Sequence, residues 1–145
     1  MSSRTVVRAF VAVAVATAVS VGVASAAQPV KDGTYSGHWK LKTCKVAICV
    51  QTVSFDTSSS GKMVQHFMVS LIPCDFGGAV ARNLSGKVTK NGTFTITYSL
   101  RNALGEQGGT LVVTGKFRAH RKETGKLTGN NKLGCRQSVG YSTEA

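Results

Sequence analysis

The residues best suited to chemistry are cationic side chains concentrated between positions 114 and 132. They are Lys116, Arg118, His120, Arg121, Lys122, Lys126 and Lys132. Ammonium and guanidinium groups hold phosphate, sulfate and carboxylate groups through charge-assisted hydrogen bonds. This segment is therefore a candidate anion-binding site, and we expect its partner to be an anionic polymer or a cell surface.

The same segment repeats a Gly-Lys-apolar pattern, at Gly115-Lys116-Phe117 and at Gly125-Lys126-Leu127. A phosphate-binding loop requires a fixed glycine spacing and a Lys-Ser or Lys-Thr pair between a strand and a helix, and the repeat has neither. Similar Gly-Thr and Gly-Lys pairs follow turn residues along the whole chain, where glycine supplies the backbone angles of tight turns. The repeat therefore marks the beginnings of β-strands.

Period-two alternation predicts where these cations lie. Lys116, Arg118 and His120 fall on the face opposite the apolar residues of their strand. Lys126 and Lys132 share this outward parity on the next strand. Arg121 and Lys122 are expected at the turn between the strands, with only Glu123 opposing them. Binding should therefore centre on the strand cations Lys116, Arg118, Lys126 and Lys132. The alternative is that these charges only solvate the sheet and discourage edge pairing. No aromatic residue accompanies them on the outward row, so there is no specific signal for nucleic acid.

The remaining titratable residues form no evident catalytic set. The acidic residues lie mostly in predicted turns or near the ends of the chain: Asp32, Asp56, Asp75, Glu106, Glu123 and Glu144. No two are spaced as a positioned acid–base pair. His38, His66 and His120 are scattered, and His66 or His120 would need a Ser or Asp partner from elsewhere. We expect no catalytic residue, metal or cofactor. The sequence leaves enzyme activity uncertain and favours its absence.

Alternating hydrophobicity predicts about eight short strands and no useful helix after residue 26. In the strand at 93–100, the residues Phe94, Ile96, Tyr98 and Leu100 face one way and hydroxyl side chains face the other. Gly115 lies on the inward row of the strand at 111–119, so we expect a bend or bulge there. The other expected strands are 34–42, 48–55, 64–72, 80–88, 126–133 and 137–142, and the facing of 64–72 is ambiguous. The predicted fold is all-β, either an antiparallel β-sandwich or an up-and-down β-barrel.

The first 26 residues are typical of a secretory signal peptide. Arg4 and Arg8 begin it, residues 9–24 are almost wholly apolar, and Ala24-Ser25-Ala26 forms a small-x-small cleavage site. The apolar run is shorter than the about 20 residues of a membrane span, and a retained anchor is the alternative. Cleavage would leave residues 27–145 as one secreted domain without a predicted membrane span. Loss of the two arginines lowers the formal net charge by two from +12, and the remaining excess favours anionic surfaces.

An even number of cysteines in an exported chain predicts disulfide bonds. The chain has Cys44, Cys49, Cys74 and Cys135, which allow three connectivities. The spacing of Cys44 and Cys49 suits a cross-strand bond closing a hairpin around residues 45–48, which leaves Cys74 to pair with Cys135. No second closely spaced pair of cysteines is present, which argues against a zinc site.

Several short motifs recur in one known group of proteins. They are Gly33-Thr34-Tyr35-Ser36-Gly37, Val53-Ser54-Phe55, Gly61-Lys62, Cys74, Cys135 and Gly140-Tyr141. In these motifs the chain resembles small secreted bacterial proteins, common in actinobacteria, that have no assigned activity. The resemblance implies an all-β domain, supports the Cys74–Cys135 bond and supplies no catalytic residues, while Cys44 and Cys49 depart from its pattern. Gly37-His38-Trp39 is also similar to the GxW motif at the first strand of lipocalin barrels.

Three classes of function are compatible with these features. The first is a secreted, non-enzymatic β-domain that binds an anionic surface or a protein through its basic sheet face. The second, implied by the GxW motif, is a barrel that carries a small apolar ligand in a cavity lined by aromatic residues. The third is a secreted hydrolase or inhibitor, for which residues 45–48 would be the exposed inhibitory loop. Oligomeric state is not addressed by the sequence.

Overall fold

The computed structural model describes residues 26–40, 50–74, 81–101, 104–118 and 121–145. This part of the chain forms eight antiparallel strands and contains no helix, as the alternating pattern predicted. The strands are β1 (Thr34–Lys40), β2 (Val50–Thr57), β3 (Met63–Val69), β4 (Ala81–Lys87), β5 (Thr93–Arg101), β6 (Gln107–Arg118), β7 (Lys122–Asn131) and β8 (Arg136–Glu144).

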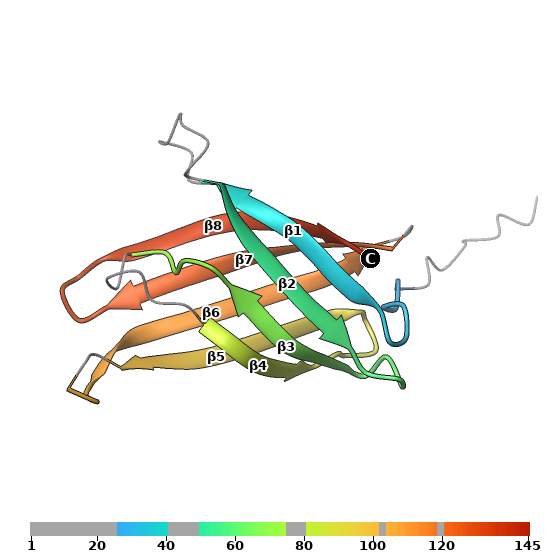
Figure 1. Cartoon of the computed structure of the whole chain (residues 1–145), viewed down its shortest axis with the longest axis horizontal. Helices are drawn as coiled ribbons and strands as arrows, with labels where there is room; N and C mark the ends of the chain where they lie inside the picture. Colours follow the sequence, from blue (N-terminus) through green and yellow to red (C-terminus); the bar gives the residue numbers. More distant parts are fainter. Residues whose placement is uncertain (1–25, 41–49, 75–80, 102–103, 119–120) are drawn as a thin grey trace, which may run out of the picture.

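The strands form a single sheet that nearly closes into an up-and-down barrel. Their order is β4-β3-β2-β1-β8-β7-β6-β5, so β1 pairs with β8 and the two ends of the sheet are β4 and β5. Val88, directly after β4, forms an isolated bridge with Phe94 of β5. The two strands also approach at Gly86, where an added Cβ would lie 2.7 Å from Cγ1 of Ile96. Figure 1 shows the long strands β5 to β8 crossed at an angle by β1 to β4. Of the two expected architectures, the structure forms the barrel.

Aromatic rings occupy the interior of the barrel. Alternation turns Tyr35, Phe55, Phe67, Phe94 and Phe117 inward, and all five are buried. Together with Tyr141 they form a continuous cluster in which the centroids of contacting rings are 4.9–6.1 Å apart. Stacked and edge-on aromatic pairs pack at these separations. The hydrophobic core therefore lies inside the barrel.

Two expectations about strand facing are settled by the sheet. In β3 the register shifts between Val64 and Phe67, so both of these side chains are buried although they are three residues apart. A β-bulge produces such a shift because it adds an unpaired residue to one strand. Phe67 faces the core and Met68 faces outward. In β5, Tyr98 was expected in the inward row, but it is 37% exposed.

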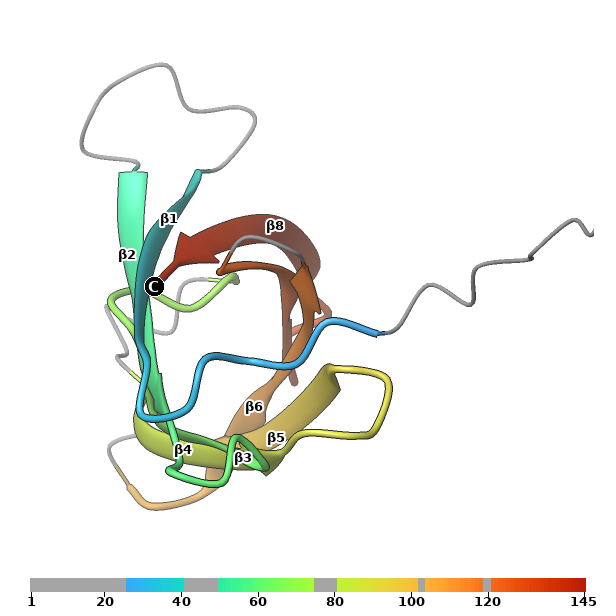
Figure 2. The same cartoon turned by 90° about the vertical axis from the view of Figure 1, so that its right-hand side faces the viewer.

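Irregular segments cross both ends of the barrel. At one end, residues 26–33 run across the opening (Figure 2) and are held by hydrogen bonds from the Val30 amide to the Tyr35 hydroxyl and from the Thr57 hydroxyl to the Val30 carbonyl. At the other end, residues 70–74 reach β7 and β8. Pro73 packs against Gly129, where a Cβ would lie 2.0 Å from the Pro73 oxygen.

The expected bulge at Gly115 is not present. The register runs without a shift through Phe94, Gly115 and Gly125 on three adjacent strands. Glycine is needed at position 115 because an added Cβ would lie 2.3 Å from both the Phe94 ring and Oε1 of Glu123. Position 115 therefore has no side chain in the inward row, and the Phe94 ring and the Glu123 carboxyl group fill the space beside it.

We expect Gly115→Ala to destabilise the protein by about 2 kcal/mol, because overpacking a filled core displaces rigid neighbours. The measurement is urea unfolding followed by circular dichroism. Gly140→Ala is the matched control, since a Cβ there would meet only the Gly125 oxygen at 3.8 Å. Equal unfolding midpoints for the two variants would show that the Phe94 ring moves aside without cost.

Candidate functional site: a basic groove on the outer face

A groove of about 400 Å³ lies on the outer face of β5, β6 and β7. Strand pairing places two outward rows across these strands. One row contains Thr95, Thr114 and Lys126, and the other contains Thr93, Lys116 and Thr124. Lys116 and Lys126 are diagonal neighbours on paired strands, which places their Cα atoms about 7–8 Å apart. The groove thus presents two ammonium groups among threonine hydroxyls.

Arg118 adds a third cation at the edge of the groove. Its Nε donates a hydrogen bond to the Thr124 hydroxyl over 3.3 Å, which orients the guanidinium toward β7. The lining contains no carboxylate. Charge within the groove is therefore uniformly positive, and the neighbouring hydroxyl groups can donate hydrogen bonds to the oxygens of a bound anion.

The other predicted cations near the β6–β7 turn do not join this groove. Lys122 lies in β7 rather than in the expected turn, and its ammonium pairs with the Glu144 carboxylate at 3.0 Å. Arg121 is exposed in the turn with a positive φ of 65°. His120 lies outside the described residues. The structure thus brings together three of the seven predicted residues.

Lys132 lies at the far end of the sheet. β7 ends at Asn131, so Lys132 belongs to the turn before β8, about 20 Å along the strand from Lys126. Its amide donates to the Gly108 oxygen over 3.2 Å. The prediction that it shares a patch with Lys126 is wrong, because outward parity in the sequence does not limit distance along a strand.

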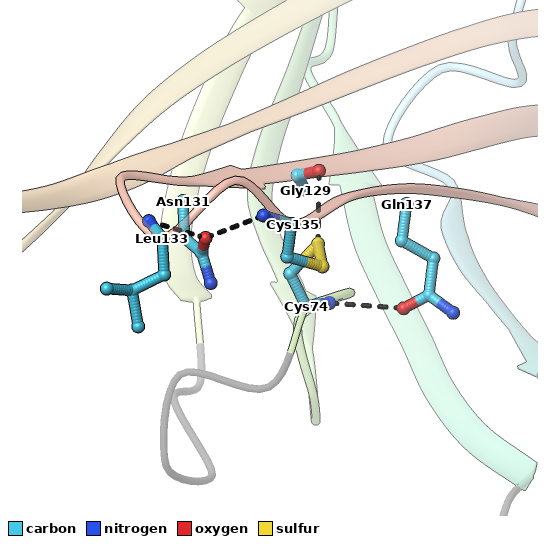
Figure 3. The surroundings of a disulfide bond; sticks show 6 residues. All are labelled: Cys74, Gly129, Asn131, Leu133, Cys135 and Gln137. Carbon is cyan, nitrogen blue, oxygen red and sulfur yellow. Dashed lines mark hydrogen bonds between the residues drawn. A yellow bond between two sulfur atoms is a disulfide. The ribbon is translucent and has the colours of Figure 1, made fainter.

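The disulfide bond between Cys74 and Cys135 anchors this same turn (Figure 3). The Cys74 amide donates to the Gln137 side chain over 3.2 Å, and the Asn131 side chain accepts from the amides of Leu133 and Cys135. The predicted Cys74–Cys135 pairing is confirmed. The predicted Cys44–Cys49 bond, the 45–48 loop and almost all of the signal peptide lie outside the described residues.

Glu123 is buried inside the barrel and does not oppose the turn cations as expected. Its side chain is 0% exposed, and its Oε2 accepts a 2.8 Å hydrogen bond from the Thr143 hydroxyl. Oε1 and the Tyr141 hydroxyl have no hydrogen-bond partner of ordinary geometry in the described chain. Burial raises the pKa of Glu123 from 4.5 to about 7, against the opposing hydrogen bonds. Burial, and then the neighbouring Glu123 carboxyl, raise the pKa of Tyr141 well above its ordinary value.

The sequence contained a signal for this placement. Glu123 has the same parity as Leu127 of the inward row, but the expected strand began at residue 126. Extending it back to Lys122, where β7 begins, would have turned Glu123 inward.

A second outward hollow, of about 280 Å³, contains a histidine–aspartate pair on β2 and β3. His66 Nδ1 lies 3.1 Å from Oδ2 of Asp56, and Oδ1 of Asp56 accepts from the Thr34 hydroxyl over 2.9 Å. Ser54 lines the same hollow, but among the described residues no hydrogen bond joins it to His66. The pair therefore lacks an activated nucleophile of the kind a hydrolase uses, and we assign it no catalytic role.

The rest of the described chain shows no cluster of three or more metal-ligating side chains. Nor does this part contain a helix long and apolar enough to span a membrane. Comparison with known proteins found no matching family model, curated protein or solved structure. The resemblances to the small secreted proteins and to lipocalins thus stay predictions.

Proposed function

We propose that the protein is a secreted, non-enzymatic β-domain that binds an anionic polymer or an anionic cell surface through the groove of Lys116, Arg118 and Lys126. The observation that carries this proposal is the gathering of three cations and four threonines around one groove that contains no carboxylate. Export is supported by the N-terminal sequence pattern and by the oxidised Cys74–Cys135 pair, because disulfides persist in oxidising compartments.

The groove suits an oxyanion-rich chain better than a base-reading function. Lysine ammonium groups act as point charges toward sulfate or phosphate, and a guanidinium can form two parallel hydrogen bonds with such a group. Phe94, the aromatic residue of the lining, is 2% exposed and cannot stack on a base. The net positive charge attracts polyanions from a distance, and salt weakens that attraction.

The alternatives have less support. A carrier of the lipocalin type would hold its ligand inside the barrel, where the described interior is filled by packed rings. An inhibitor would use the 45–48 loop, which lies outside the described residues. A hydrolase would need an activated nucleophile beside His66, and among the described residues no hydrogen bond joins Ser54 to His66. The groove is therefore the surface on which we base the proposal.

The triple variant Lys116→Gln, Arg118→Gln, Lys126→Gln tests the groove. We expect its affinity for heparin to fall at least about threefold, because each exposed ionic contact contributes about 0.2–1 kcal/mol. The measurement is the salt concentration that elutes the protein from a heparin column, together with a binding titration at fixed salt. The melting temperature should hardly change, because exposed charges alter stability by at most about 0.5 kcal/mol each.

The control is Lys31→Gln, Lys132→Gln, Arg136→Gln, which removes the same number of lysines and arginines from exposed sites away from the groove. This control should retain most of the heparin affinity. If both triple variants elute at the same salt concentration, retention reflects net charge alone and the groove has no special role.

A further inference from the structure

A hollow of about 430 Å³ lies at the corner where β4 turns into β5. Small-molecule pockets have volumes of about 300–1,000 Å³, so the hollow is large enough for a ligand. One wall is the turn that follows Val88, and another is the N-terminal segment, whose Gln28 side chain donates to the Lys90 oxygen over 2.8 Å. Figure 2 shows this turn (yellow) beside the end of the barrel crossed by residues 26–33 (blue).

The floor of the hollow is apolar and firmly held. Met63 and Val88 are half-buried there, and Val88 packs against the hydrophobic core. The Val88 amide donates to the Lys62 oxygen over 2.8 Å, and Met63 pairs with Lys87 across β3 and β4. An apolar group placed on this floor would lose contact with water while the sheet beneath it stays unchanged.

The rim of the hollow carries three exposed lysines, Lys62, Lys87 and Lys90. None of the lining residues is acidic, and in the described chain none of these lysines forms an ion pair. Lysine stems extend an apolar surface while their ammonium groups stay in water. The hollow is therefore apolar at its floor and cationic at its rim.

We propose that this hollow binds a single-chain anionic amphiphile, a fatty carboxylate whose acyl chain lies on Met63 and Val88 while its head group meets the lysines. The charge of the rim selects the anionic head, and the apolar floor selects the chain. A sugar polymer or a free phosphate would leave the floor unused. This site shares no residue with the basic groove and is independent of the function proposed for it.

Titration of the mature protein with dodecanoate below its micelle concentration, followed by calorimetry, tests this site. We expect saturable binding that weakens at least about tenfold in Met63→Glu, which places a carboxylate on the floor, and in Lys62→Gln, Lys87→Gln, Lys90→Gln. Met63→Leu keeps the floor apolar and should bind as the wild type does. Dodecanol, which has no charge, should bind at least about tenfold more weakly than dodecanoate.

The groove variant Lys116→Gln, Arg118→Gln, Lys126→Gln should bind dodecanoate within about twofold of the wild type. The proposal is overturned if wild-type protein does not bind dodecanoate, if dodecanol binds equally well, or if the groove variant loses binding as much as the hollow variants do. If Met63→Glu alters the circular dichroism spectrum, its loss of binding reflects a change of fold and is set aside. The test of the site then rests on Lys62→Gln, Lys87→Gln, Lys90→Gln, because these three side chains are exposed. Heparin retention is measured on the same variants, so failure of one site does not affect the conclusion about the other.

Discussion

Replacing Glu123 with glutamine is expected to raise the free energy of unfolding by about 3 kcal/mol at about pH 8. Burial raises the pKa of this carboxyl from 4.5 to about 7. Above the higher pKa the folded protein must hold a charge inside its aromatic core, whereas the unfolded chain exposes that charge to water. Glutamine is neutral at every pH, and its oxygen can still accept the hydrogen bond from Thr143.

The direction in which the stability of the wild type changes with pH follows from the protons bound in its folded and unfolded states. Between the unfolded and folded pKa values, the folded state holds a proton that the unfolded state has lost. Unfolding therefore releases a proton, and stability falls as pH rises from about 5 to about 8. The difference in stability between the wild type and Glu123→Gln should be small near pH 4.5 and should grow toward pH 8. Urea unfolding at several pH values in this range measures it.

Glu144→Gln is the control for this experiment. Glu144 is exposed and pairs with Lys122 on the outer face, so its removal should change stability by less than about 1 kcal/mol. Its pH profile should also run parallel to that of the wild type across this range. If Glu123→Gln runs parallel to the wild type as well, the buried carboxyl does not hold the raised pKa.

Removing the Cys74–Cys135 bond with Cys74→Ser, Cys135→Ser is expected to lower the free energy of unfolding by about 4 kcal/mol. The two cysteines are separated by 61 residues, so the bond restricts the unfolded chain strongly. Substitution is preferable to a reductant, which would also act on any bond formed by Cys44 and Cys49. Urea unfolding of the variant and the wild type at one pH measures the change.

Gln137→Ala separates the covalent bond from the contacts around it. This variant removes the hydrogen bond that the Cys74 amide donates, and it should cost about 1 kcal/mol. If the double serine variant is no less stable than Gln137→Ala, the packing of Pro73 against Gly129 holds residues 70–74 in place without the disulfide.

The sequence alone predicted the all-β class, most of the strands and the Cys74–Cys135 pair. These features follow from local rules: alternation assigns faces, glycine marks turns, and an even number of cysteines favours pairing. The outward placement of Lys116, Arg118 and Lys126 also followed from parity, because a regular strand repeats its facing every two residues.

Only the tertiary structure decided which residues meet. Parity treated Lys132 as a residue of the same strand as Lys126, but β7 ends at Asn131, and Lys132 lies in the turn at the opposite end from the groove. Glu123 shares the inward parity of Leu127 but resembled a turn residue because the beginning of β7 is polar, and pairing with β6 and β8 makes this polar segment part of the strand. Gly115 resembled a bend, but its role depends on the Phe94 ring and the Glu123 carboxyl.

Closure of the barrel and its surface hollows also lay beyond the sequence. At the closure, Gly86 approaches Ile96 of β5, a residue that sequence alternation does not relate to it. The lysine-rimmed hollow joins Gln28 to Lys62, to Met63 of β3 and to residues 87–90. Local alternation determines the face on which a side chain lies, because it depends on neighbours within one strand. Which faces and strand ends come together depends on contacts between residues far apart in the chain, and only the folded barrel determines these contacts.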